Sequence, residues 1–180
     1  DLAKKRAKKQ IELIAEDLVQ LYAERQLRKG IKFEKDSSWQ QEMESAFIYE
    51  ITPDQLTSTN EIKKDMESEK SMERLLCGDV GFGKTEVAIR AAFKAVMSGY
   101  QVAVLSPTTL LTEQHYHSFK ERLAQYPVRV AMLSRFRSKI MLDKDILSIS
   151  KGEIDIAIGT HRLLSKDIKF KNLGLLVVDE

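Results

Sequence analysis

The sequence has few of the features that indicate a secreted or membrane protein. Its 180 residues contain a single cysteine, Cys77, which cannot form an internal disulfide and favours a reducing cytoplasm. No apolar run approaches the roughly 20 residues of a membrane span, and the N-terminus has no signal-peptide pattern. We therefore predict a cytoplasmic protein with no membrane contact.

The sequence also lacks a strong net charge. Its formal net charge is +2, so any nucleic-acid site must be a local patch, not the whole surface. The three histidines, His115, His117 and His161, have no accompanying cysteine or carboxylate spacing that would indicate a metal site. There is no internal repeat or low-complexity segment, and the length suits about one domain.

What is present is a phosphate-binding motif. Eight residues fit the pattern G-x-x-x-x-G-K-[ST]: Gly78, Asp79, Val80, Gly81, Phe82, Gly83, Lys84 and Thr85. The apolar run 74–77 before them predicts a buried strand, and residues 86–97 predict a helix that ends at Gly99. Strand, loop and helix together favour a phosphate site over a plain glycine-rich turn, with Lys84 neutralising the β- and γ-phosphates and Thr85 holding Mg²⁺.

The N-terminal part reads as a helix that is separate from this core. Residues 2–29 carry an apolar stripe at helical spacing, and Gly30 is a natural stop. The basic run 4–9 either touches phosphates or, as we favour, only solvates the helix end. We predict a connector helix with its linker over residues 1–38 and a motor lobe over residues 39–180.

Gln55 has two interpretations that the residues leave open. A short helix is expected at 39–46, and a second is expected to run from Pro53 to about residue 69. Thr52 and Gln55 fit a capping box, so Gln55 can simply cap that helix. Its amide can equally pair with the edge of an adenine, with Phe47 lying against the base.

After the phosphate motif, strands and helices alternate. We expect strands at 101–106, 128–133, 154–158 and 173–178, and helices at 110–125 and 139–150. This order predicts an α/β fold: a parallel sheet with helices on both faces and ligands at the carboxyl ends of the strands. The segments expected at that edge are Gly78–Thr85, Ser106–Thr109, Ser134–Arg137, Gly159–His161 and Asp179–Glu180.

Two carboxylates end the last apolar strand. Asp179 can bind Mg²⁺ beside Thr85, and Glu180 can orient or deprotonate an attacking water, which is the positioning that phosphoryl transfer needs. Acidic residues that merely leave a strand into solvent are the alternative. Small hydroxyl residues at two other strand ends suit a nucleic-acid backbone, although turn and cap chemistry explains them equally well.

In this order, the motifs resemble superfamily 2 helicase and translocase motors. Residues 72–88, 133–137 and 159–165 look like those of the bacterial transcription-repair coupling factors, and the resemblance covers nearly the whole chain. It implies a RecA-like P-loop NTPase lobe preceded by a long relay helix. It also implies an ATP-driven double-stranded DNA translocase of the bacterial cytoplasm that displaces stalled RNA polymerase and couples transcription to nucleotide excision repair.

The resemblance assigns a role to each motif. It makes Lys84 and Glu180 catalytic, Thr85 and Asp179 ligands of Mg²⁺, and Phe47, Gln55 and residues Gly78 to Glu86 the ATP contacts. The implied DNA contacts are Pro107, Thr108, Thr109, Arg135, Gly159, Thr160 and His161. RNA polymerase and repair proteins would bind through modules that the sequence does not contain.

The resemblance further implies that the lobe is incomplete. In the family's sheet, the strand after the Asp-Glu pair lies between the strand before the P-loop and the strand that ends in Asp-Glu. We therefore expect these two strands not to pair directly, the chain to be part of a longer protein with a second motor lobe, and the piece alone to hydrolyse little ATP. Direct hydrogen bonds between the two strands would contradict this expectation.

Three alternatives remain at this point. A RecG-type helicase that remodels branched DNA shares the P-loop context and the Thr-His turn, but residues 133–137 and the first helix favour the coupling factors. A P-loop kinase or GTPase is disfavoured, because no Asn-Lys-x-Asp follows and the Asp-Glu strand end suits a motor ATPase. A non-enzymatic interaction piece is the third alternative.

Overall fold

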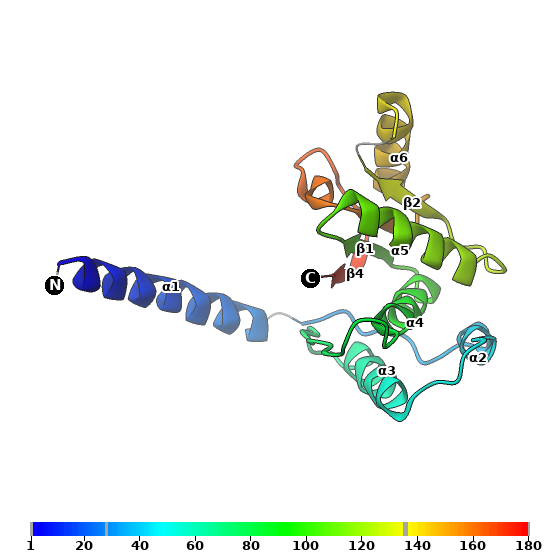
Figure 1. Ribbon diagram of the computed structural model, residues 1–180, viewed down its shortest axis with the longest axis horizontal. Helices are drawn as coiled ribbons and strands as arrows, with labels where there is room; N and C mark the ends of the chain where they lie inside the picture. Colours follow the sequence, from blue (N-terminus) through cyan, green and yellow to red (C-terminus); the bar gives the residue numbers. More distant parts are fainter. Residues whose placement is uncertain (1, 28, 135–136, 180) are drawn as a thin grey trace.

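The computed structural model describes residues 2–27, 29–134 and 137–179. A 26-residue helix, α1 (Leu2–Leu27), projects away from an α/β lobe that contains all other elements (Figure 1). This agrees with the helix expected at 2–29. The stripe residues Ile11, Ile14, Leu18, Leu21 and Tyr22 are all exposed. Helix α1 therefore stands apart from the core of the lobe, as the sequence predicts.

The lobe is built on one parallel sheet of four strands in the order β2-β3-β1-β4. The strands are β1 (Gln101–Leu105), β2 (Val130–Leu133), β3 (Ile156–Gly159) and β4 (Leu173–Val178). In register, Leu105 lies beside Gly159 on one side and beside Val178 on the other, and Gly159 lies beside Leu133. All four predicted strands are thus confirmed, and their carboxyl ends share one edge.

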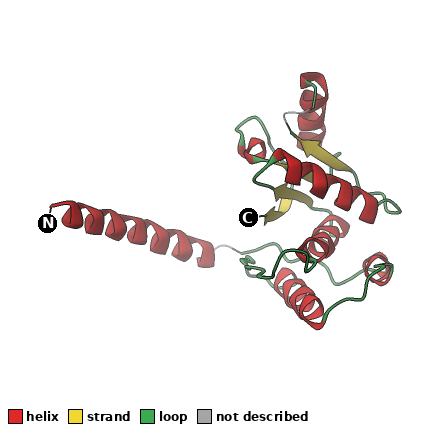
Figure 2. Ribbon diagram, viewed as in Figure 1, coloured by secondary structure: helices red, strands yellow, loops and turns green. Residues whose placement is uncertain are grey.

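Helices cover both faces of this sheet, as predicted (Figure 2). The alternation along β3 shows why: Ile156 and Ile158 face one core with α4 (Lys84–Met97) and α5 (Thr109–Arg122), whereas Ala157 faces the other. That second core holds α6 (Lys139–Lys151) and the short 3₁₀ helix η1 (His161–Leu164). Because both faces are buried along β1 and β3, these two central strands read as nearly continuous apolar runs, whereas the edge strand β4 keeps Leu176 and Val178 exposed.

The segment between α1 and the P-loop packs against α4. It contains α2 (Ser38–Ser45) and α3 (Pro53–Met66), which begins at Thr52 with the predicted capping box. The expected linker 30–38 contributes to the core: the Phe33 ring is buried edge-on against Tyr100, with ring centroids 5.4 Å apart. The division into 1–38 and 39–180 stays a prediction.

The prediction of a strand at residues 74–77 is wrong. Residues 71–79 run extended but outside the sheet, and Cys77, expected in a buried strand, is exposed. Arg74 instead forms ion pairs with Glu61 and Asp65 of α3. No backbone hydrogen bond joins residues 74–77 to β4, both of which lie in the described part of the chain. A strand forms only beside a pairing partner. Direct pairing of residues 74–77 with β4, which would contradict the expected gap in the sheet, is not found among the described residues.

None of the helices in the described part of the chain combines the length and the apolar character that crossing a membrane requires.

Candidate functional site

The P-loop forms a tight turn that leads directly into α4. Gly81 and Gly83 adopt positive φ angles of 86° and 72°, which glycine tolerates and side-chain-bearing residues rarely do. Gly83 is the N-cap of α4, and no side chain in the described part of the chain caps this helix end. The first backbone N–H groups of α4 are therefore available to an anion, and the helix dipole favours negative charge there.

Lys84, the first residue of α4, folds back over the loop. Its Nζ donates to the carbonyl oxygens of Gly78 at 2.6 Å and of Asp79 at 2.9 Å. These two contacts hold the ammonium group above the turn that the glycines create. A phosphate in this turn would meet both a positive charge and the uncapped helix end.

An open cavity of about 880 Å³ lies beside the loop, within the size range of nucleotide and cofactor sites. Its lining includes Phe47, Gln55, residues 81–83, Thr85 and Glu86. The structure thus brings the P-loop and the two predicted adenine contacts to one cavity. These residues come from the loop before α4, from α4 itself, from α3 and from the segment before α3, which are separate in the sequence.

Gln55 makes both a cap and a contact with the P-loop. Its Oε1 accepts from the backbone N–H of Thr52 at 3.0 Å, which completes the capping box. Its Nε2 donates to the carbonyl oxygen of Phe82 at 2.8 Å. A Cβ added to Gly83 would collide with this Nε2, so the loop and α3 fit closely there. The capping role is confirmed, and the pairing with adenine stays a prediction.

Phe47 lies against two cations. The guanidinium carbons of Arg90 and Arg122 sit 5.5 and 5.4 Å from its ring centroid, within the range of a cation–π contact. The Tyr49 ring meets it edge-on, with centroids 5.5 Å apart. These contacts fix the ring at the cavity wall, where it can act as the predicted neighbour of a base.

Glu86, predicted as a nucleotide contact, is only 7% exposed and already has two cationic partners. Its carboxylate accepts from Arg90 Nε at 2.8 Å and from both Nε and a terminal nitrogen of Arg122 at 3.0 Å. Arg122 also donates to the carbonyl oxygen of Met43 in α2. The helix that carries the P-loop lysine is therefore joined by buried charge to α5 and α2.

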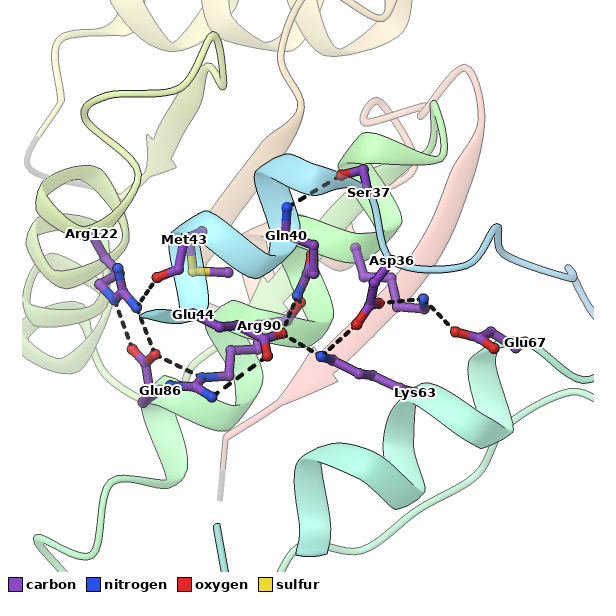
Figure 3. A network of polar contacts seen from close by, with 11 residues as sticks. Asp36, Ser37, Gln40, Met43, Glu44, Lys63, Glu67, Glu86, Arg90 and Arg122 are labelled. Atoms are coloured by element: carbon purple, nitrogen blue, oxygen red, sulfur yellow. Dashed lines mark hydrogen bonds and ion pairs between the residues drawn. The ribbon is translucent and has the colours of Figure 1, made fainter. Parts of the chain in front are cut away.

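The same network continues to the segment that follows α1 (Figure 3). Lys94 of α4, which is 2% exposed, contacts Asp36 at 2.8 Å and Glu67 at 2.7 Å. Lys63 of α3 contacts Asp36 at 2.7 Å and Glu44 at 2.5 Å. Together with the contacts of Glu86 and Arg90, these ion pairs attach α2, α3, α5 and the segment that follows α1 to helix α4.

Replacing Lys94 by methionine should lower the free energy of unfolding by about 2–3 kcal/mol, because two carboxylates lose a buried partner but remain partly hydrated. Lys8→Met in α1 is the control: its pair with Glu12 is exposed and 3.9 Å long, so its loss should cost under about 0.5 kcal/mol. Denaturant unfolding measures both values, and equal losses would contradict this account of the network.

Asp36 makes the network sensitive to acid. Burial alone would raise its pKa, but the hydrogen bonds from Lys63 and Lys94 outweigh burial and hold the pKa below the usual value. The unfolded value is about 3.9, so the stabilisation is complete above that pH and is lost as the pH falls through the folded pKa. Asp36→Asn should therefore destabilise the chain at pH 7 and differ less from wild type below about pH 4. Asp17→Asn, at an exposed position of α1, should show no such change; a gap for Asp36→Asn that persists in acid would refute the assignment.

The strand ends meet at the edge where the sequence placed them. The backbone N–H of Asp179 donates to Leu105 at 2.8 Å, and that of Ser106 donates to Gly159 at 2.9 Å. Asp179, Ser106 and Gly159 are therefore neighbours, although they lie far apart in the sequence. Glu180 and Arg135, both predicted as site residues, lie outside the described residues.

The predicted DNA contacts divide by exposure. Pro107, Thr108 and His161 are exposed at the strand-end edge, whereas Thr160 is buried. Thr108 also caps α5, because its hydroxyl accepts from the backbone N–H of Leu111 at 3.2 Å. The cap chemistry considered for this residue is thus confirmed. Contact between DNA and these residues, together with Thr109 and Gly159, stays a prediction.

One contact at the site was missed in the sequence. His115 of α5 lies 2.6 Å from Asp179, between Nε2 and Oδ2. Because an ionised carboxylate only accepts hydrogen bonds, the imidazole Nε2–H is the donor. The two residues are 64 positions apart, and no local pattern links them. Only the packing of α5 against the sheet brings them together.

The donor types around Thr85 and Asp179 suit a magnesium ion. A hydroxyl and a carboxylate are the oxygen ligands that Mg²⁺ prefers, and a site with few protein ligands is usual when phosphates and waters supply the others. No cluster of three or more histidine, cysteine, aspartate or glutamate side chains that would suit another metal exists in the described ranges. The residues therefore fit an ion that is brought in with a nucleotide.

A family model described as DEAD/DEAH box helicase matches residues 52–180. The chain is 57% identical over 180 residues to the transcription-repair-coupling factor of Bacillus subtilis (strain 168), covering 98% of this chain and 15% of that protein. It is 54% identical over 177 residues to the protein of the same name from Borreliella burgdorferi, covering 98% and 16%. The chain thus spans less than a fifth of the length of these relatives.

Solved structures resemble the lobe as well. A structure of RecG bound to a three-way DNA junction matches with a TM-score of 0.84 at 37% identity, covering 89% of this chain and 22% of that one. A hypothetical ATP-dependent RNA helicase from Sulfolobus tokodaii matches with a TM-score of 0.60 at 16% identity, covering 80% and 41%, and this likeness concerns the fold alone.

Proposed function

Because this chain belongs to the DEAD/DEAH box helicase family, a membership that implies nucleotide binding, we propose that it is the first RecA-like lobe of an ATP-dependent double-stranded DNA translocase. One observation carries the proposal. The uncapped start of α4, with Lys84 folded over it, opens beside a cavity lined by Gln55 and Phe47. Phosphate chemistry and a place for a base therefore meet in one site.

The wider role that we propose is the displacement of stalled RNA polymerase and the coupling of transcription to nucleotide excision repair. The support is the identity of 51–57% to proteins named transcription-repair-coupling factor across 98% of the chain. The partners would be double-stranded DNA, a second motor lobe, and RNA polymerase and repair proteins that bind modules outside this chain. The place of action would be the bacterial cytoplasm.

Within the site, each residue has a proposed task. Lys84 binds the β- and γ-phosphates, Thr85 and Asp179 hold Mg²⁺, Glu180 orients the attacking water, and Gln55 and Phe47 hold the adenine. The magnesium ion, when bound with the nucleotide, would neutralise developing charge on the phosphates. The exposed residues Pro107, Thr108 and His161, with their neighbours at the strand ends, would contact the DNA backbone.

A triplex-displacement assay tests the proposal. A third-strand oligonucleotide is annealed to duplex DNA, and the full-length protein is added with ATP. Translocation along the duplex should release the oligonucleotide with ATP but not with a non-hydrolysable analogue. If the oligonucleotide stays bound although the protein hydrolyses ATP, translocation on duplex DNA is excluded.

A second candidate, remodelling of branched DNA, has one observation in its favour, the TM-score of 0.84 to the RecG lobe. The same protein separates the two functions. A coupling factor should displace the third strand from unbranched duplex and leave a three-way junction intact, whereas a RecG-type helicase should convert the junction.

A further inference from the structure

The contact between His115 and Asp179 has no part in the roles proposed so far. The His115 side chain is 13% exposed and that of Asp179 is 31% exposed, so the pair is partly shielded from water. The Nε2–H of His115 occupies Oδ2 of the carboxylate at 2.6 Å. A hydrogen bond from a second residue to one oxygen of a metal-binding carboxylate is the kind of contact that orients such a ligand.

The helix that carries His115 begins at a predicted DNA contact. Thr108 caps α5, and His115 follows seven residues later, so both lie on the same side of the helix. Thr112 and Phe119, on that side as well, are fully buried against the sheet. Helix α5 therefore joins the segment at Pro107–Thr109 to the carboxylate through a packed, regular element.

The far end of α5 is also fixed to the nucleotide side of the lobe. Arg122, seven residues after His115, bonds Glu86, the residue that follows Thr85. A second connection runs through the backbone, where Asp179 donates to Leu105, two residues before Pro107. A displacement of the segment 107–109 would thus reach Asp179 by two routes, one through the backbone at Leu105 and one through α5. The route through α5 acts on the Asp179 side chain, because His115 contacts its carboxylate.

We infer that His115 is a positioning residue: it orients the Asp179 carboxylate for the nucleotide-bound magnesium and links that carboxylate to the DNA contact at the start of α5. The inference rests on the proposed function, because it assigns His115 to the same magnesium site. It adds a residue that touches neither nucleotide nor DNA but through which DNA binding alters the metal site.

The chain provides a matched control on the same helix. His117 is exposed, and its ring meets Tyr116 edge-on, so it has the same chemistry without the carboxylate. Glutamine at position 115 is the conservative variant, because its Nε2 can replace the donor of the imidazole. Alanine at position 115 removes the donor.

The test uses the full-length protein and a fluorescent ADP, with and without duplex DNA. Magnesium is titrated, and the concentration that gives half-maximal ADP binding is the readout, beside ADP binding in EDTA and denaturant unfolding. We expect His115→Ala to raise the magnesium midpoint about tenfold and to abolish the change that DNA causes in wild type. ADP binding in EDTA should be unchanged, His115→Gln should recover most of the wild-type midpoint, and His117→Ala should match wild type.

Other results would overturn the inference. These are a midpoint for His115→Ala within twofold of wild type, an undiminished response to DNA, or an equal shift in His117→Ala. If His115→Ala unfolds at a lower denaturant concentration than wild type, the magnesium midpoint of His115→Gln is compared with that of wild type instead. A shifted magnesium midpoint in the folded His115→Gln variant counts against the inference. Failure of the proposed function gives a different result: Lys84→Ala would then leave ADP binding unchanged. In that case His115 would have no metal ion to position, and both proposals would be wrong.

Discussion

Lys84→Ala should weaken binding of Mg·ADP about 100-fold, since one charge-assisted hydrogen bond to phosphate contributes about 1.5–3 kcal/mol and Lys84 can donate more than one. In the structure the ammonium group already lies over the loop, on the carbonyl oxygens of Gly78 and Asp79. Its loss removes positive charge at the point where the uncapped start of α4 receives the phosphates. Calorimetric titration measures the affinity, and circular dichroism confirms that the variant is folded.

Lys139→Ala is the matched control for this substitution. Lys139 is also the first residue of a helix, α6, but Ser138 caps that helix and no glycine loop precedes it. Its affinity for Mg·ADP should equal that of wild type. Equal affinity of a folded Lys84→Ala variant would show that the P-loop does not bind the phosphates.

Asp179→Asn should slow ATP hydrolysis by the full-length protein about 100-fold, because the loss of a metal-binding carboxylate removes several kcal/mol of charge stabilisation from phosphoryl transfer. The substitution keeps the shape of the side chain, and its backbone bond to Leu105 remains. Folding should therefore be preserved, and the defect should appear in turnover more than in nucleotide affinity. A coupled assay with saturating DNA gives the rate.

Asp143→Asn is the control for the loss of a carboxylate. Asp143 is exposed on α6, on the sheet face opposite α4 and α5. Turnover should be unchanged in this variant. A wild-type rate in Asp179→Asn would remove Asp179 from the magnesium site.

The elements of this fold were predictable where a local pattern determines them. The strand at 173–178, the capping box at Thr52 and the helix that ends before Gly99 depend on neighbouring residues, and the structure contains each of them. The common edge of the strand ends followed from the alternation of strands and helices, because parallel strands place their carboxyl ends together.

Features that depend on distant partners were not predictable in the same way. The run at 74–77 is apolar enough for a strand, but a strand needs a neighbour to pair with, and β4 pairs with β1 instead. The segment 30–38 has the composition of a linker, yet Phe33 is buried against Tyr100 and Asp36 meets two lysines. The sequence shows the chemistry of these residues but not what they contact.

In the site, too, features set by neighbouring residues were predictable and contacts between distant residues were not. The P-loop motif predicted the glycine turn and the start of α4, because its residues are consecutive and its geometry is local. His115 had no motif to indicate it, since its partner Asp179 is 64 residues away. The second contact of Gln55, to the Phe82 carbonyl, was hidden for the same reason, although the capping box had already drawn attention to this residue.

The measurement that tests the central claim most directly is release of RNA polymerase from DNA. A polymerase stalled by nucleotide omission is held on an end-labelled template, and the full-length protein is added with ATP. We expect the complex to dissociate with ATP and to persist with a non-hydrolysable analogue or with the Lys84→Ala variant. A stalled complex that survives active ATP hydrolysis by the wild-type protein would contradict the account.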